Sequence, residues 1–360
     1  MSYTPVVRPS SVVSYLPTKQ FDPRLSIYNL QTDTLRKVRR ALARAQGGTG
    51  FCKIACLGDS TTEGSFATIG STDWPNVLRA LLTARGYPLA GTGFVRAKAG
   101  NVDPRVTTTG APSSIGMLLQ LNGAVGTQTI TFASALAGTV VDVYYLDQNA
   151  AATFSVNIDG TGATTVTGMG DNTFKKTSFT GLSNAAHSVV ITRVGTVAPY
   201  IGGFDVHQVS GVSVSNFGLS GQIASAFSQG NDYDLTGATI VYGADLTFIM
   251  LQINDANAST PVATYTTAVQ VIINRIVTAG NSNIVLVITD PVVSTTAPIG
   301  LYIDATYQLA DSYGFAVLDI SDRWKSYAIS NGLGLMADGV HPNVLGYADI
   351  ARAAMNCIEA

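Results

Sequence analysis

The sequence has few charged side chains, few cysteines and no long uninterrupted apolar run. Only 12% of its 360 residues are Asp, Glu, Lys or Arg, about half the share found in an ordinary soluble domain. Its formal net charge of −2 lacks the positive excess that binding to a polyanion requires, so we expect no nucleic-acid partner. No apolar stretch reaches the roughly 20 residues of a membrane-spanning helix, so we expect no membrane insertion. The polar surface must come from Thr, Ser, Asn and Gly, a balance common in secreted, viral and cell-surface β-rich proteins.

The three cysteines, Cys52, Cys56 and Cys357, show no metal-ligand spacing. Cys52 and Cys56 lie four residues apart along a predicted strand, so their Cα atoms are about 13 Å apart, too far for a disulfide. We therefore expect buried free thiols, no metal site and no cofactor. The first residues show no basic segment followed by an apolar one, so no signal peptide is expected. Composition favours an extracellular or virion-associated location, reached by lysis or by assembly into a particle.

The N-terminal part combines an irregular segment with a short basic helix. Residues 1–32 carry Pro, Ser and Thr without a clear period, and residues 33–45 follow a helical period with Leu35, Val38 and Leu42 on one face. Basic residues crowd the rest of that helix; a solvated face is the ordinary interpretation, and a docking surface is the alternative. We assign residues 1–45 to an N-terminal extended segment and basic helix, through which the chain could attach to a virion or oligomer partner.

Apolar strands and amphipathic helices alternate in residues 46–99 and again in 206–360. The predicted strands are short β-rich runs, as in a parallel sheet buried on both faces: 53–58, 211–216, 246–253, 284–288 and 315–319. The predicted helices carry their apolar residues on one face and are followed or preceded by stop and start signals: 74–85, 262–279 and 344–358. The alternation predicts an α/β fold with a doubly wound, mostly parallel, flavodoxin-like sheet.

Residues 100–205 interrupt this alternation. They show no helical period, and Thr, Ser, Val and Gly dominate short alternating runs such as TQTITF and VVDVYYL, with turn signals between them. We expect an inserted all-β domain, a sandwich or a jelly roll. The aromatic residues of this segment alternate within strands, which favours a position in its core. Carbohydrate binding by these aromatic residues is the open alternative.

One serine and one late loop carry the residue types of nucleophilic catalysis. Ser60 directly follows the strand 53–58, in GDSTTEG, where reactive groups of open α/β sheets lie. The loop DGVHPN before the last helix holds Asp338 and His341, three residues apart, so one turn can bring both side chains to the same side. A carboxylate orients an imidazole, whose other nitrogen can take the proton of a serine hydroxyl. These features predict a catalytic set of Ser60, Asp338 and His341.

Four sequence blocks, taken in order, resemble the SGNH (GDSL-like) hydrolase family. GDSTTEG with DWPNVLRALL resembles its first block, NFGLSGQ its second, LQINDAN its third and DGVHPN its last. The resemblance covers roughly residues 50–95 and 210–358. It implies an SGNH-type fold, a serine mechanism, and oxyanion donors from the glycine of the second block and the asparagine of the third, which are Gly221 and Asn254 here.

An oxyanion hole and an acyl pocket follow from this resemblance. The N–H of Ser60, the N–H of Gly221 and the side-chain amide of Asn254 are the three expected donors to the oxyanion. The third block departs from the family pattern, because Gln252 and Ile253 stand where small glycines are usual. If these side chains face the pocket, their bulk favours a short acyl group such as acetyl; both could also point away.

The sequence therefore predicts a serine esterase that removes O-acetyl groups from a carbohydrate or polysaccharide. Low charge and the β-rich insert are similar to those of esterases from bacteriophage tails and of secreted carbohydrate deacetylases, an analogy that does not by itself establish function. A lipase or thioesterase with the same three residues is the alternative enzyme. A receptor-binding particle protein without activity is the non-enzymatic alternative, against which the five intact site residues weigh.

Overall fold

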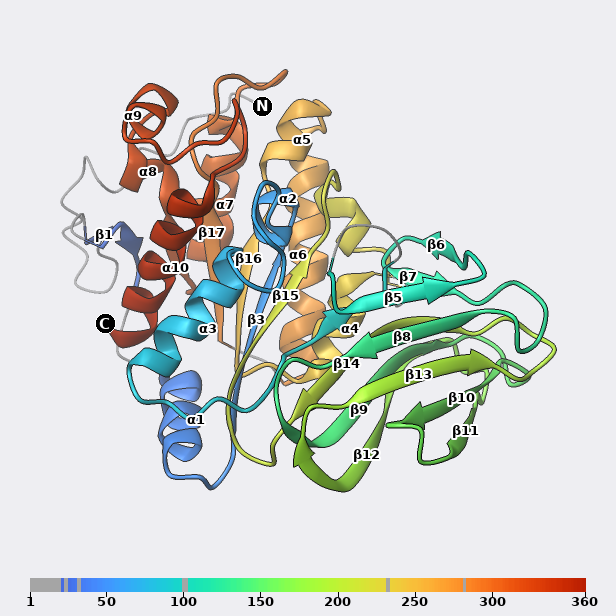
Figure 1. Cartoon of the computed structure of the whole chain (residues 1–360). Helices are drawn as coiled ribbons and strands as arrows, with labels where there is room; N and C mark the ends of the chain where they lie inside the picture. The colour runs from blue at the N-terminus through green and yellow to red at the C-terminus, as the bar shows by residue number, and fades with distance from the viewer. Residues whose placement is uncertain (1–20, 23–24, 31–33, 99–102, 231–233, 281–282) are drawn as a thin grey trace.

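A computed structural model describes residues 21–22, 25–30, 34–98, 103–230, 234–280 and 283–360. Residues 1–20 of the predicted N-terminal unit 1–45 lie outside the described residues, and the attachment role of this unit stays a prediction. The described chain forms an α/β part around a central sheet and a β part that lies beside one edge of this sheet (Figure 1).

The central sheet has seven strands in the order β1-β2-β18-β17-β16-β3-β15. Their bounds are β1 Phe21–Asp22, β2 Ile27–Tyr28, β3 Phe51–Gly58, β15 Gly211–Gly218, β16 Leu246–Met250, β17 Ile284–Ile288 and β18 Ala316–Asp319. The five strands from β18 to β15 are mutually parallel, and β2 adds an antiparallel edge. Numbered along the chain, these five strands follow the flavodoxin-like order 2-1-3-4-5, which confirms the predicted doubly wound, mostly parallel sheet.

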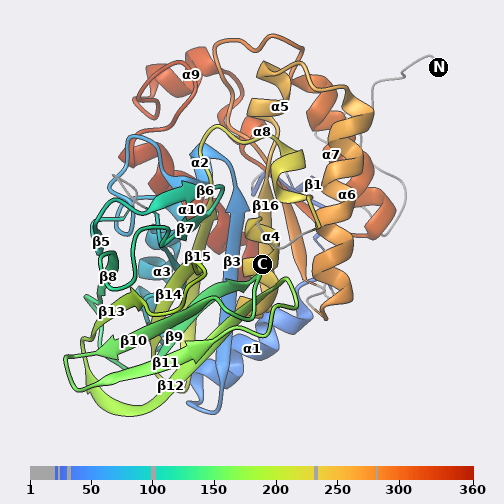
Figure 2. The same ribbon diagram turned by 90° about the vertical axis from the view of Figure 1, so that its right-hand side faces the viewer.

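Helices cover both faces of this sheet (Figure 2). One face packs against α1 Arg36–Gln46, α3 Trp74–Ala84 and α10 Val344–Glu359, and the other against α4 Leu235–Tyr242, α6 Val262–Thr278 and α7 Gly300–Tyr313. Alternate residues of β3 enter the two cores: Ile54 and Cys56 on the first face, Ala55 and Leu57 on the second. The three cysteines are free and buried in the first core, as expected.

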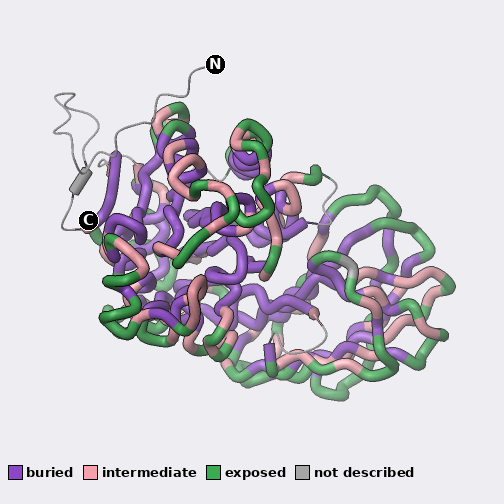
Figure 3. The backbone as a smooth tube through the Cα atoms, turned by 90° about the horizontal axis from the view of Figure 1, so that it is seen from above, coloured by how far each residue is buried: buried purple, intermediate pink, exposed green. Residues whose placement is uncertain are grey.

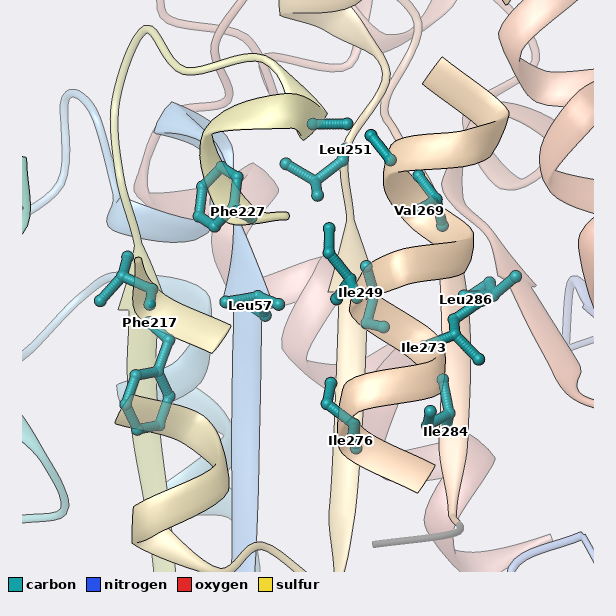
Figure 4. Packing of buried hydrophobic residues seen from close by; sticks show 14 of the residues in the cluster. Leu57, Phe217, Phe227, Ile249, Leu251, Val269, Ile273, Ile276, Ile284 and Leu286 are labelled. Atoms are coloured by element: carbon teal, nitrogen blue, oxygen red, sulfur yellow. The ribbon is translucent and has the colours of Figure 1, made fainter. Parts of the chain in front are cut away.

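Helix α6 illustrates how periodicity becomes packing (Figure 4). Its residues Val269, Ile273 and Ile276 lie on one face at helical spacing and belong to the same buried apolar cluster as Ile249 and Leu286 of the sheet. Each such side chain removes enough apolar surface from water to contribute about 1.5–3 kcal/mol relative to exposure. The remaining helices are short. Four of them come after strands, α2 Ser60–Glu63, η2 Ala224–Phe227, α5 Ile253–Asn257 and α8 Ile320–Trp324, and α9 Tyr327–Gly332 follows α8.

We call residues 95–207 the β region. They form two antiparallel sheets. One contains β5 Val106–Thr109, β8 Thr129–Ala133, β10 Thr153–Ile158, β11 Ala163–Thr167 and β13 Ser188–Arg193. The other contains β4 Val95–Arg96, β6 Ser113–Ile115, β7 Leu118–Gln120, β9 Gly138–Asp147, β12 Thr173–Ala185 and β14 Tyr200–His207. Side chains of both sheets share one apolar core. Buried and less buried positions alternate along β8 and β10, whereas β9 and β14 are buried almost throughout. Figure 3 shows the distribution of burial over the whole described chain. The assignment of residues 100–205 as a separate inserted domain stays a prediction.

Aromatic packing joins the β region to the α/β part. Phe94, just before β4, stacks on Phe217 of β15 at 4.7 Å between ring centroids and meets Tyr144 of β9 edge to face at 5.1 Å. Tyr144 and Phe174 of β12 belong to the same apolar cluster as the second face of the central sheet. The two parts therefore share a core, so the β region is held in a fixed position beside the carboxyl ends of β3 and β15.

Candidate active site

The structure brings Ser60, His341 and Asp338 into a single hydrogen-bonded series. The distance from His341 Nε2 to Ser60 Oγ is 3.0 Å, and from His341 Nδ1 to Asp338 Oδ2 it is also 3.0 Å. Ser60 is almost fully buried, and His341 is partly exposed at the same place. A hydroxyl, an imidazole and a carboxylate at these spacings can activate the hydroxyl oxygen as a nucleophile.

The backbone of β3 approaches that of the neighbouring strand β16 closely at Gly58, and this contact fixes the position of Ser60 at the end of β3. A Cβ on Gly58 would lie 2.6 Å from the carbonyl oxygen of Met250 in the neighbouring strand, so only glycine fits there. Asp59 then caps the short helix α2 by accepting a hydrogen bond from the N–H of Thr61 at 3.0 Å. Glycine and Asp therefore turn the chain sharply, and Ser60 is the first residue after the turn.

The His341 loop is closed by its own hydrogen bonds. The second carboxylate oxygen of Asp338 accepts from the backbone N–H groups of Val340 and His341 at 2.7 and 2.6 Å. The N–H of Ala337 donates to the carbonyl of His341 at 2.9 Å. Burial raises the pKa of Asp338, but these backbone bonds and the imidazole contact outweigh burial and hold it below its ordinary value. The carboxylate is thus ionised and fixed against the imidazole.

The two further oxyanion candidates lie at the ends of the strands that flank β3. Gly221 follows β15, Asn254 lies in α5 after β16, and β3 is between these strands in the sheet. Gly221 has a left-handed backbone with φ of +75°, a conformation that favours glycine. The amide nitrogen of Asn254 donates to the carbonyl of Gln222 at 3.0 Å, which links the two loops. Three adjacent parallel strands therefore present these residues at the same edge of the sheet as Ser60.

Gln252 and Ile253, the residues expected to line the acyl pocket, lie next to the Asn254 candidate, and that expected role stays a prediction. Both side chains are buried, at 2% and 1% exposed. The Gln252 amide nitrogen donates to the carbonyl of Val287 at 3.1 Å, and its oxygen accepts from the N–H of Thr289 at 3.2 Å. A buried amide must satisfy its polar atoms, and here it does so against the end of β17. The Gln252 side chain is therefore fixed against the end of the neighbouring strand.

Glu63 and Arg96 form a buried ion pair beside the site that the sequence did not reveal. Both side chains are about 5% exposed, and Arg96 also donates to the carbonyl of Gly218 at 2.7 Å. The other oxygen of Glu63 accepts from the backbone N–H of Ser220 at 2.7 Å and from its hydroxyl. Burial raises the pKa of Glu63, but the Arg96 guanidinium and the hydrogen bonds from Ser220 outweigh burial and hold this pKa below its ordinary value. The Glu63 carboxylate is therefore ionised. The pair fixes the residue that precedes Gly221.

Asp59 and Asp255, next to the site residues, serve as hydrogen-bond acceptors. Asp255 accepts from the N–H of Ala224 at 2.8 Å, which holds the far end of the loop that contains Gly221. Burial raises the pKa of Asp255, and it raises that of Asp59 to about 7. Neither carboxyl bonds to Ser60 or His341 in the hydrogen-bond pattern of the described residues.

The described residues contain no group of three or more His, Cys, Asp or Glu side chains that could hold a metal ion. In the same part of the chain, no helix has the length and apolar character needed to cross a bilayer.

Comparisons with known proteins agree with this geometry. Residues 201–348 match the model of the GDSL-like Lipase/Acylhydrolase family. The matched range includes Gly221, Asn254, Asp338 and His341, whereas Ser60 lies before it. No curated protein matches the sequence.

Solved structures show the fold. A peptidoglycan O-acetylesterase has a TM-score of 0.67 and 17% identity, and the match covers 90% of this chain and 95% of that one. A structure from Bacillus subtilis (TM-score 0.39, 15% identity, 77% and 91% covered) and a family two carbohydrate esterase from Cellvibrio japonicus (0.28, 12%, 74% and 98%) are too distant to support a conclusion. The first similarity shows that this chain and that esterase share one fold over most of both lengths.

Proposed function

We propose that the protein is a serine esterase in which Ser60 is the nucleophile, His341 the general base and Asp338 the residue that orients the imidazole. The observation that carries this proposal is the continuous series of hydrogen bonds from Ser60 through His341 to Asp338. The match of the second half of the chain to an acylhydrolase family supports the same chemistry.

The reaction then proceeds in two steps. His341 Nε2 takes the proton of the Ser60 hydroxyl as its oxygen attacks the ester carbonyl, and returns this proton to the departing alcohol, leaving an acyl group on Ser60. Water, activated by the same nitrogen, releases the acid. Negative charge on the carbonyl oxygen is met by the N–H groups of Ser60 and Gly221 and by the Asn254 amide, each expected to contribute about 10²–10³ in rate.

We propose an O-acetyl group on a carbohydrate as the scissile ester. The similarity in fold to a peptidoglycan O-acetylesterase over most of both chains supports this choice. The fixed position of the β region beside the carboxyl ends of β3 and β15 supports it further, because a rigid wall there can contact a polymeric substrate.

A lipase or thioesterase is the second candidate, and one observation favours it. Phe66 and Val293, both more than half exposed, lie next to the catalytic loop and offer apolar surface that a lipid substrate could cover.

The decisive experiment measures acetate release from a panel of acetylated polysaccharides, including peptidoglycan, alongside nitrophenyl esters from C2 to C12. The proposal predicts acetate release from at least one glycan, a higher kcat/KM for C2 than for C8, and loss of both activities in Ser60→Ala. A higher kcat/KM for C8 or C12 would select the lipase. Absence of all hydrolysis by the folded wild-type protein would leave a non-catalytic particle protein as the better interpretation.

A further inference from the structure

Phe66 is held in an unfavourable state directly beside the catalytic imidazole. Its backbone has φ of +63°, a left-handed conformation that a bulky aromatic residue rarely adopts. Its ring is 63% exposed, so the side chain gains little from burial. The ring centroid lies 5.6 Å from that of His341, with the planes tilted by 46°.

The surrounding segment fixes this placement. The hydroxyl of Tyr347, a buried residue of α10, donates to the carbonyl of Ser65 at 2.7 Å. The N–H of Ser65 donates to the carbonyl of Ser60 at 3.0 Å, and the N–H of Ala67 donates to that of Gly64 at 2.9 Å. The residues on both sides of Phe66 are therefore anchored, one of them to the nucleophile itself. Strain that persists in an anchored segment beside an active site is a reason to look for a binding role.

A second exposed apolar residue lies beside the same catalytic loop. The N–H of Val293 donates to the carbonyl of Gly339 at 2.8 Å, and Val293 is 58% exposed. Gly339 lies between Asp338 and His341, and a Cβ on it would meet the Val293 side chain at 3.1 Å. Two exposed apolar residues, Phe66 and Val293, therefore lie beside the polar catalytic loop.

The direction of the reaction decides which part of the substrate meets Phe66. In the proposed mechanism the imidazole delivers its proton to the departing alcohol, so the alcohol part of the ester lies on the His341 side. The acyl oxygen lies at the donors of Gly221 and Asn254, on the ends of β15 and β16. A ring in contact with His341 therefore faces the alcohol, which is the sugar when the substrate is an acetylated carbohydrate.

We propose that Phe66 is a substrate-binding platform on which the sugar ring that carries the acetyl ester stacks. An aromatic face suits the apolar C–H face of a pyranose, and the sugar hydroxyls stay in water. This inference rests on the proposed esterase function and extends it to the alcohol side of the substrate. Phe66 thus binds the leaving group, and other residues select the length of the acyl group.

The test compares Phe66→Ala, Phe66→Trp and Phe66→Gly on two acetyl esters that differ only in the alcohol. The substrates are the acetylated glycan cleaved best by the wild type, and ethyl acetate, which has no ring to stack. We expect Phe66→Ala to lower kcat/KM for the glycan about tenfold, mainly through KM, as loss of a stacking contact does. Its kcat/KM for ethyl acetate should stay within about twofold, and Phe66→Trp should restore glycan cleavage.

Phe66→Gly separates binding from strain, because glycine adopts a positive φ without cost. The Phe66→Gly variant should have a higher melting temperature than Phe66→Ala. Its kcat/KM for the glycan should fall to the same degree as in Phe66→Ala. Val277→Ala, at an exposed apolar position on α6, is the matched control and should change neither substrate.

Three results would overturn the inference. An unchanged kcat/KM for the glycan in Phe66→Ala would show that Phe66 does not bind the sugar. An equal fall in kcat/KM for ethyl acetate would show that Phe66 only positions His341. A loss confined to ethyl esters of longer acids, such as ethyl butyrate, would assign Phe66 to the acyl side. In each of these cases the esterase proposal still stands if hydrolysis is lost in Ser60→Ala. The esterase proposal itself fails if Ser60→Ala retains full hydrolysis.

Discussion

Glu63 offers the sharpest perturbation of the site short of the catalytic residues. Replacing it by Gln removes the negative charge that faces Arg96 and leaves one oxygen where the wild type has two. Arg96 is 5% exposed and its Nε already lacks a partner within the described residues. Breaking a buried ion pair by neutralising one member costs about 3–5 kcal/mol, because the other charge remains buried.

The rate should fall for a different reason. A single amide oxygen cannot accept from both Arg96 and Ser220 as the two carboxylate oxygens do. Ser220 then loses its anchor, and the N–H of the next residue, Gly221, loses its position. The limit of this effect is complete loss of one oxyanion donor, about 10²–10³ in kcat. We therefore predict a fall in kcat towards this limit, with a smaller change in KM.

A second variant distinguishes loss of stability from loss of position. Arg96→Met in the Glu63→Gln background removes the unpaired guanidinium and should recover part of the free energy of unfolding. The kcat should stay low, because Ser220 still lacks its carboxylate. Unfolding in urea and initial rates on nitrophenyl acetate measure the two quantities. If kcat recovers together with stability, or if Glu63→Gln changes kcat less than twofold, Glu63 does not position the oxyanion loop.

Three further predictions concern the imidazole, the cap of α2 and the β region. Asp338→Asn should lower kcat by up to about 10⁴ with native circular dichroism, because the imidazole loses its orienting carboxylate; near-normal kcat would contradict this. Since burial raises the pKa of Asp59 to about 7, its stabilising neutral form is lost as pH rises from about 4 to 7. Asp59→Asn, which keeps the cap, should therefore be more stable than wild type at pH 8 by at most about 4 kcal/mol and equal at pH 4; urea unfolding giving the same difference at both pH values would exclude this cause. Replacing residues 100–205 by a Gly/Ser linker removes Tyr144 and Phe174 from the core of the α/β part and should unfold the chain; a folded, active deletion on circular dichroism and ester assay would show that the β region is independent.

The sequence predicted those features of the fold that depend on local pattern. Continuous apolar runs predicted the buried parallel strands, and the spacing of Val269, Ile273 and Ile276 predicted the face of α6. Because reactive loops follow the carboxyl ends of strands in such sheets, the order of motifs also indicated which loops would meet. The geometry at Ser60, His341 and Asp338 agrees with that expectation, while their catalytic roles stay a proposal.

Other features depend on tertiary structure and leave no local signal. The direction in which Gln252 points is set by the partners its amide finds on β17, which residue type alone does not reveal. The pairing of Glu63 with Arg96, 33 residues apart, requires β4 to pair with β14, a contact across the whole β region. The positive φ of Phe66 follows from anchors on α2 and α10, whereas an aromatic residue in a sequence suggests a core position.

The central claim is that Ser60 is the nucleophile. Incubation with a fluorophosphonate, followed by intact-mass and peptide mass spectrometry, tests it most directly. The account predicts one adduct per chain, located on Ser60, loss of esterase activity in proportion to labelling, and no adduct in Ser60→Ala. An adduct on another serine, or ester hydrolysis that persists after complete labelling of Ser60, would contradict it.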